Sequence, residues 1–165
     1  MIMETVERNG RLGSRDPGLL AWLRMLRVYT EVDRRTAELL KAYDLTVAQF
    51  DVIAQVGAHE GTTQQGLADS LMVTKGNVTQ LLDRLEDRGL IERRQIPGRR
   101  GKCLFLTPEG WRLNRRVVPV QEAMISEAFS CVPVEDRQRL HTILVQLDRA
   151  LTANEAVESH AEIDR

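Results

Sequence analysis

The feature that most constrains this chain of 165 residues is the order of short patterns between residues 64 and 107. Apolar residues recur at helical spacing in Gln64–Leu71 and again in Lys75–Leu85, and only a short segment separates the two runs. Two runs typical of β-strands follow, with the turn residues Pro97 and Gly98 between them. The pattern predicts two helices joined by a tight turn, followed by an antiparallel hairpin.

The two predicted helices can pack as a helix-turn-helix. This motif needs a small residue where the helices cross, and Ala68 occupies that place. Thr74 is placed to cap the second helix. Apolar residues are available to hold the two helices together: Leu67, Leu71, Val73, Val78, Leu81, Leu82 and Leu85. The remaining face of the second helix is polar, so it is either a solvated surface or a binding surface.

That polar face carries side chains suited to a DNA major groove. Asn and Gln can pair with adenine, Thr can contact a thymine methyl group or a phosphate, and Lys or Arg can bind guanine or a phosphate. Glycine at position 76 removes a side chain that would hold the backbone away from DNA. We therefore predict a recognition helix with these DNA contacts: Thr74, Lys75, Gly76, Asn77, Thr79, Gln80 and Arg84.

The predicted hairpin is basic although the whole chain has a formal net charge of −1. Residues 93–102 contain four Arg, one Lys and no carboxylate. A local cationic patch attracts phosphate in a salt-dependent way. The hairpin is therefore predicted to be a wing that contacts DNA through Arg94, Arg99, Arg100 and Lys102. Arg93 and Arg94 lie at its base, where one of them could equally form a structural ion pair with Glu92 or Asp87.

Further helical patterns lie on both sides of this module. Their starts are marked, in chain order, by Asp16-Pro17, Thr46, Thr107-Pro108 and Val132-Pro133. Pro119 falls inside the third of these helices and predicts a kink rather than a break. The last helix carries an apolar stripe: Leu140, Ile143, Leu144, Leu147 and Leu151.

The expected fold is mostly α with a small β-wing. A winged helix-turn-helix module at residues 61–107 would be flanked by N-terminal and C-terminal dimerisation helices at 17–60 and 108–153. Residues 1–16 and 154–165 are polar and are expected to be flexible tails. The apolar faces of the flanking helices exceed what one small module can cover, and such faces usually pack against a second copy. We therefore expect a homodimer.

Other function classes find little support in the sequence. The three histidines (His59, His141 and His160) are scattered, and neither a nucleophile–base pair nor a Gly-rich phosphate loop is recognisable. We therefore expect that the protein is not an enzyme and that it binds neither a metal ion nor a cofactor. No run approaches the roughly 18 apolar residues of a membrane span, and the N-terminus lacks the apolar core of a signal peptide. The expectation is a cytoplasmic protein that binds double-stranded DNA and no membrane.

Several motifs, in this order, strongly resemble the MarR family of bacterial winged-helix regulators. They are Leu45-Thr46, Phe50-Asp51-Val52-Ile53, Leu67-Ala68, Val73-Thr74, residues 78–86, Gly89-Leu90-Ile91, Arg99-Arg100 and Leu106-Thr107-Pro108-Glu109-Gly110. The resemblance covers roughly residues 17–151. It implies an obligate homodimer whose terminal helices interlock and which binds a palindromic operator. Each recognition helix would occupy a major groove, with the wings over adjacent minor grooves.

The resemblance also implies a transcriptional repressor that is released by a ligand. Such regulators mostly repress, and they leave DNA when a small aromatic or phenolic effector binds between the dimerisation helices and the DNA-binding module. Trp22 and Tyr29 share the apolar face of the first helix and could line such a pocket, but core packing or dimer contact is the favoured explanation of both. The family's wing commonly has an acidic residue two positions before the arginine matched by Arg100. Gly98 stands there in this chain, which implies a more mobile wing.

Two other functions stay open at the level of the sequence. The chain could be a thiol-based redox sensor that uses Cys103 or Cys131, although a small buried apolar role is the simpler explanation of either cysteine. The winged module could also bind protein instead of DNA. The outer helix of such protein-binding modules is usually more apolar or more acidic than the one predicted here.

Overall fold

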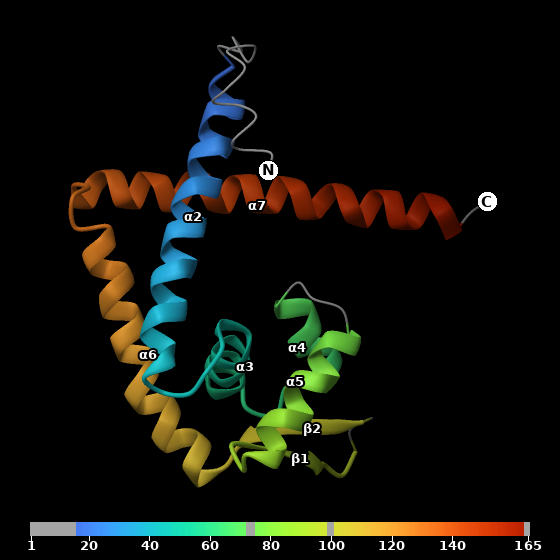
Figure 1. The fold of residues 1–165 in the computed structure, drawn as a ribbon. Coiled ribbons are helices and arrows are strands. Elements are labelled where there is room, and N and C mark those ends of the chain that lie inside the picture. Colours follow the sequence, from blue (N-terminus) through green and yellow to red (C-terminus); the bar gives the residue numbers. More distant parts are fainter. Residues whose placement is uncertain (1–15, 72–74, 99–100, 164–165) are drawn as a thin grey trace. The chain divides into compact units, whose positions relative to one another are not determined.

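The computed structural model describes residues 16–71, 75–98 and 101–163, and its helices and strands follow the predicted order (Figure 1). Val73 and three predicted DNA contacts, Thr74, Arg99 and Arg100, lie outside the described residues. The chain divides into two compact units, residues 1–121 and residues 122–165. Among the described residues, no helix combines the length and the apolar character that crossing a membrane requires.

Both helices before the module begin at the predicted caps. Helix α2 spans Pro17–Lys41, and an Asp16 carboxylate oxygen accepts a hydrogen bond from the Leu19 N–H at 2.8 Å. Helix α3 spans Val47–Ala58. Thr46 and Gln49 form a reciprocal capping box, in which the Gln49 N–H donates to the Thr46 hydroxyl and the Thr46 N–H donates to the Gln49 side chain. These bonds satisfy amide groups that the first turn of a helix leaves unpaired.

The two helices predicted for the helix-turn-helix and the two strands of the hairpin are confirmed. Helix α4 spans Gln64–Ser70, helix α5 spans Lys75–Asp87, and strands β1 (Ile91–Gln95) and β2 (Lys102–Leu106) pair antiparallel. The other edge of β2 is also paired, because Leu104 exchanges backbone hydrogen bonds of 2.9 Å with Gly61 and Thr62. The hairpin is therefore joined to the segment that leads into α4.

The core of the first unit is formed by the apolar faces of α3, α4 and α5 and by the hairpin. Leu67, Val78, Leu82 and Leu85 are fully buried, and Ala68 is nearly so, as the sequence predicts. Leu71 and Leu81 pack against this core at partial burial. The other buried apolar side chains are Leu40, Leu45, Phe50, Val52, Ile53, Val56, Leu90, Ile91, Cys103, Leu104, Leu106 and Val117.

Helix α6, which spans Pro108–Ala128, begins against Gly89 and Leu90, the residues between α5 and β1. The Thr107 hydroxyl accepts a hydrogen bond from the Gly110 N–H at 3.0 Å and donates one to the Gly89 carbonyl at 2.6 Å. A Cβ atom at Gly110 would lie only 2.0 Å from the Leu90 carbonyl oxygen, so this close approach requires glycine. The helix is unbroken at Pro119, as the sequence predicts, and the kink expected there stays a prediction.

The second unit contains α7, which spans Val134–Ile163. The helix continues past residue 153, where the sequence predicts a flexible tail. Residues 154–163 are polar, but they contain several Ala and Glu and neither Pro nor Gly, so their helix propensity is high. The side chains of the predicted apolar stripe, from Leu140 to Leu151, are 37% to 60% exposed in the single chain.

Candidate nucleic-acid interface

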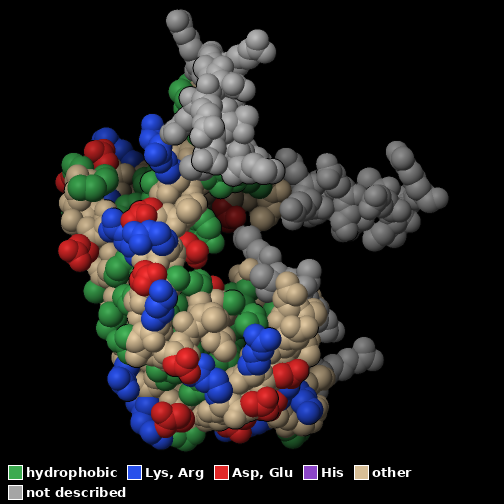
Figure 2. All heavy atoms as spheres, viewed as in Figure 1, with side chains coloured by type: hydrophobic (Ala, Val, Ile, Leu, Met, Phe, Trp, Pro, Cys, Tyr) green, Lys and Arg blue, Asp and Glu red, His purple; other side chains and the backbone are tan. Residues whose placement is uncertain are grey.

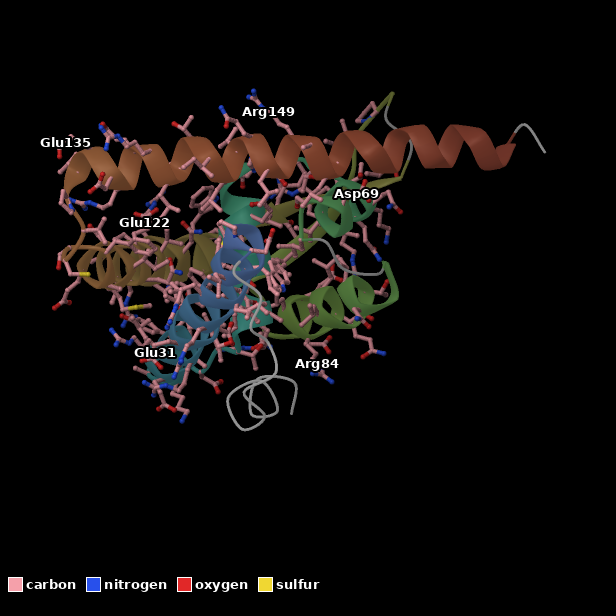
Figure 3. All side chains as sticks on the ribbon, turned by 90° about the horizontal axis from the view of Figure 1, so that it is seen from above. Glu31, Asp69, Arg84, Glu122, Glu135 and Arg149 are labelled. Carbon is pink, nitrogen blue, oxygen red and sulfur yellow. The ribbon has the colours of Figure 1, made fainter. Side chains whose placement is uncertain are left out.

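Helix α5 presents a polar face to solvent. Gly76, Asn77, Gln80 and Arg84 are exposed, and the Arg84 side chain extends outward from the helix (Figure 3). Lys75 is the first residue of the helix. The apolar side chains of α5 face the core, and Val78, Leu82 and Leu85 are fully buried there, so the polar residues form the exposed side of the helix. Amide and guanidinium groups on such a face can hydrogen-bond to base edges or phosphates.

Gly76 lies in the first turn of α5. A Cβ atom at this position would meet no described atom within 4 Å. Packing within the chain therefore does not require glycine there, and glycine lowers helix propensity. The absence of a side chain lets another molecule approach the backbone closely, as the sequence predicts for DNA.

Thr79 is half-buried, unlike the other predicted contacts of α5 with described side chains. Its hydroxyl accepts a hydrogen bond from the Gln64 side-chain amide, which joins α4 to α5. Thr79 therefore has a structural role whether or not it also contacts DNA. Sequence reasoning missed Gln64, because a polar residue in the first turn of a short helix carries no signal of a specific partner.

Arg94 lies on the exposed side of the wing and forms an ion pair with Glu92, one of the pairings predicted from the sequence. Its guanidinium also lies over the Phe105 ring, 4.9 Å from the ring centre. The hydrogen bond from Arg94 lowers the pKa of the Glu92 carboxyl below its usual value of 4.5. Lys102, at the start of β2, is exposed as well.

Arg93 points to a different set of partners from those the sequence suggests. Its two terminal nitrogens lie 2.7 Å from carboxylate oxygens of Asp83 and Glu86 on α5, whereas the predicted partners are Glu92 and Asp87. The side chain is 16% exposed. Because Arg93 is bound to acids on the neighbouring helix, its role is to hold β1 against α5.

The turn of the wing explains why glycine stands at position 98. Gly98 and Gly101 have φ angles of +79° and +81°, a conformation that residues with a Cβ atom rarely adopt. A Cβ atom at Gly98 would meet no described atom within 4 Å, so the backbone and not the available space favours glycine. An acidic side chain at this position would strain the turn.

Charges of both signs are interleaved around the interface. Over the first unit, blue Lys and Arg side chains alternate with red Asp and Glu side chains on the face that Figure 2 shows. A shallow pocket lies beside the wing, between α4 and β2. It is lined by two cationic side chains, Arg93 and Lys102, and by the polar residues Thr63, Gln64 and Gln65. A surface of this kind binds phosphate at particular places rather than everywhere.

The remaining candidate residues lie elsewhere in the chain. Trp22 and Tyr29 on α2 are 53% and 67% exposed, so an enclosed pocket at these residues would need a covering surface. Cys103 is buried in β2, and Cys131 is exposed. Within the described part of the chain, no three His, Cys, Asp or Glu residues are grouped so that they could hold a metal ion.

Comparison with known proteins gives a consistent result. Residues 43–101 match the family model described as MarR family. An uncharacterised HTH-type transcriptional regulator of Bacillus cereus is 37% identical over 123 residues, which cover 74% of this chain and 82% of the relative. The HTH-type transcriptional regulator PecS of Dickeya dadantii is 30% identical over 132 residues, covering 78% of this chain and 80% of PecS.

Solved structures agree with these sequence matches. A MarR-family transcriptional regulator from a Rhodococcus species superposes with a TM-score of 0.71 at 25% identity, covering 81% of this chain and 96% of that protein. The S. aureus MepR structure, solved as a complex with DNA, gives a TM-score of 0.70 at 25% identity and covers 79% of this chain and 94% of MepR.

Proposed function

Because this chain belongs to the MarR family of DNA-binding transcriptional regulators, we propose that it acts as a homodimer on a palindromic operator and leaves that DNA when a small ligand binds. The proposed activity is repression. The DNA contacts are proposed to come from the polar face of α5 and from the wing, β1–β2.

The observation that carries this proposal is the exposed polar face of α5 beside a basic hairpin. Asn77, Gln80 and Arg84 are exposed on one helix whose other face is buried, so they can enter a major groove together. Lys102 and Arg94 are exposed on the neighbouring strands, where they can bind phosphates. The similar protein MepR forms a complex with DNA, which supports the same use of this fold here.

The proposed dimer is supported by apolar faces that the chain leaves exposed. On α2, Leu20, Trp22, Val28 and Tyr29 are 48% to 67% exposed, and on α7 the apolar stripe is similarly open. Exposed apolar surface of this extent is typical of interaction sites. In the proposed homodimer, α2 and α7 of one chain pack against the equivalent helices of a second copy, and the two α5 helices lie one DNA turn apart, roughly 34–36 Å.

The proposed release by ligand is a shift between two arrangements of the dimer. A ligand that prefers the arrangement in which the two α5 helices do not match the groove spacing lowers DNA affinity. Trp22 and Tyr29 are candidates for the walls of its pocket. Their exposure in the single chain means that a second copy would have to complete the pocket, so ligand binding and dimer geometry would be coupled. An aromatic or phenolic acid fits the stacking surfaces that these side chains offer.

The experiment that tests the proposal begins with selection of bound fragments from a random pool of DNA duplexes. The expected product is a palindromic sequence whose half-sites are one helical turn apart. Small aromatic acids are then screened for release of the selected duplex. Selection of a sequence without twofold symmetry would contradict the homodimer on a palindrome, and enrichment of no sequence would contradict specific binding.

A further inference from the structure

The side chain of Arg93 connects the wing to the recognition helix. Arg93 lies on β1, and its Nη2 atom is 2.7 Å from a carboxylate oxygen of Asp83, while its Nη1 atom is 2.7 Å from one of Glu86. The Arg93 backbone N–H also donates to the Glu86 carboxylate at 3.3 Å. One residue of the wing is thus joined to two acids on successive turns of α5.

The same guanidinium reaches the residue that ties α5 to α4. Arg93 Nη2 donates to the Thr79 carbonyl at 3.4 Å, and the Thr79 hydroxyl accepts the hydrogen bond from Gln64. Helix α4, helix α5 and strand β1 therefore meet at Thr79. We call Arg93, Asp83 and Glu86 the wing clamp.

Directional contacts decide the angle between two elements more strictly than apolar packing does. The hydrophobic effect that buries Leu85 and Ile91 between α5 and the hairpin is non-directional. The planar guanidinium of arginine offers donors in a fixed geometry, and pairing with carboxylates on two turns of a helix fixes both distance and orientation. A lysine ammonium at this place could not bridge both acids in the same way.

We propose that Arg93 is a positioning residue that sets the angle of the wing relative to α5, so that the wing meets the minor groove while α5 occupies the major groove. This inference rests on the proposed function, since it assumes that both elements contact the same DNA. Asp83 and Glu86 serve in it as anchors of the wing and do not contact bases.

A direct phosphate contact is the alternative role for a basic residue on a wing. The surroundings of Arg93 oppose it, because both terminal nitrogens bind carboxylates and the side chain is 16% exposed. Asp83 and Glu86 are themselves half-exposed and would repel a phosphate placed beside them. The two roles differ in one measurable quantity. Loss of a phosphate contact of Arg93 makes the salt dependence of DNA affinity shallower by about one unit only when Arg93 itself is replaced. Loss of positioning moves the other basic side chains of the wing off the DNA, so it makes the salt dependence shallower alike whether Arg93 or its two acids are replaced.

The test breaks the wing clamp from each side. Arg93→Gln removes a positive charge, and the double variant Asp83→Asn with Glu86→Gln removes two negative charges. A purely electrostatic role predicts opposite effects of the two proteins on DNA affinity. Positioning predicts the same change in the DNA contacts of both. Arg88→Gln is the matched control, because Arg88 forms an ion pair with Asp44, away from the wing.

The selected operator duplex is probed with hydroxyl radicals, which report minor-groove contacts, and with dimethyl sulfate, which reports guanine contacts in the major groove. The expected result is that both clamp variants lose the minor-groove protection beside each half-site and keep the major-groove protection. Both clamp variants are expected to lower affinity about tenfold or more and to share the same shallower salt slope, because the phosphate contacts of the wing are lost in both. Arg88→Gln is expected to keep the full wild-type footprint and slope.

Three results would overturn the inference. Wild-type footprints from both clamp variants would show that the wing does not depend on the clamp. A salt slope shallower by about one unit in Arg93→Gln alone would make Arg93 a phosphate ligand. A wild-type protein that protects no duplex would remove the proposed function, and this inference with it. If Arg93→Gln does not fold, as judged by circular dichroism, the carboxylate variant decides between the first result and the expected one.

Discussion

The Arg93 guanidinium lies 2.7 Å from a carboxylate oxygen of Asp83 and thereby joins the first strand of the wing to helix α5. The arginine is largely buried, so removing it leaves Asp83 and Glu86 close together without their shared cation. Breaking a largely buried ion pair costs more than breaking an exposed one, because the remaining charges lose a partner that water replaces only in part.

Arg93→Gln is therefore expected to lower the free energy of unfolding by about 1–3 kcal/mol. Urea denaturation followed by circular dichroism measures this change. Arg112→Gln is a suitable control, because its pair with Glu109 is exposed on both sides and should contribute less than about 1 kcal/mol. Equal effects of the two substitutions would mean that the wing clamp adds no stability of its own.

Gly76→Ala is expected to change stability and DNA affinity in opposite directions. Alanine favours the helix by up to about 1 kcal/mol over glycine, and its methyl group meets no described atom of the chain within 4 Å. The same methyl group would hold DNA away from the start of α5 and weaken binding about tenfold or more. Thermal denaturation and a binding titration on the selected duplex give the two values.

The control for this substitution is Gly18→Ala, which changes the second residue of α2 as Gly76 is the second residue of α5. Gly18 lies outside the proposed interface, so DNA affinity should stay unchanged. If Gly76→Ala also binds DNA as the wild type does, the backbone of α5 does not approach DNA closely at this residue.

Gly110→Ala is expected to destabilise the first unit. The new methyl group would lie 2.0 Å from the Leu90 carbonyl oxygen, a distance at which backbone must move. Overpacking of this kind costs about 1–3 kcal/mol. Denaturant unfolding of Gly110→Ala beside Gly76→Ala separates the effect of crowding from that of a glycine substitution in general. A midpoint at or above that of the wild type would show that α6 can shift away from Leu90 freely.

Arg84→Ala is expected to weaken DNA binding because Arg84 extends outward from α5 (Figure 3). If Arg84 binds a phosphate, affinity falls on all sequences and the salt slope becomes shallower by about one unit. If it binds a base, preference at one operator position relaxes. Arg88→Ala, which removes a side chain held by Asp44 at the end of α5, should do neither. Wild-type affinity, slope and preference in Arg84→Ala would exclude it from the interface.

Asp51 makes stability depend on pH. Burial raises the pKa of its carboxyl above the usual 3.8, and the negative charge of Asp33 adds to this effect. A raised pKa in the folded state means that the ionised form costs stability once the pH exceeds the unfolded value. Asp51→Asn is therefore expected to increase the free energy of unfolding at pH 7, with a gain that shrinks as the pH falls toward 3.8 and below. Asp33→Asn should give a smaller gain, since burial is the larger cause. A gain independent of pH would contradict this assignment.

The parts of the fold that were predictable depend on residues close together in sequence. Asp16 and Thr46 predict the starts of their helices because each side chain accepts a hydrogen bond from an N–H group only three residues further on. Gly98 and Gly101 indicate the turn of the wing, because a tight turn often needs positive φ angles, which glycine adopts readily. The order of helices and hairpin follows from such local signals together with the apolar spacing.

The parts that were not predictable depend on contacts between distant elements. The partners of Arg93 depend on how β1 packs against α5. The sequence alone gives no reason to prefer Asp83 and Glu86 over Asp87 as these partners. The burial of Thr79 depends likewise on the approach of Gln64 from α4. The extension of α7 to Ile163 has another physical reason: the polar composition of residues 154–165 predicts a tail, whereas their helix propensity favours a continued helix.

The most direct measurement is the stoichiometry of the complex with the selected duplex, determined by native mass spectrometry over a range of protein concentrations. The proposed function predicts complexes of two chains with each palindromic duplex, because two α5 helices must occupy successive major grooves together. It predicts no complex of a single chain with a duplex. A dominant complex of one chain on one duplex, or equal binding of a duplex of scrambled sequence, would contradict it.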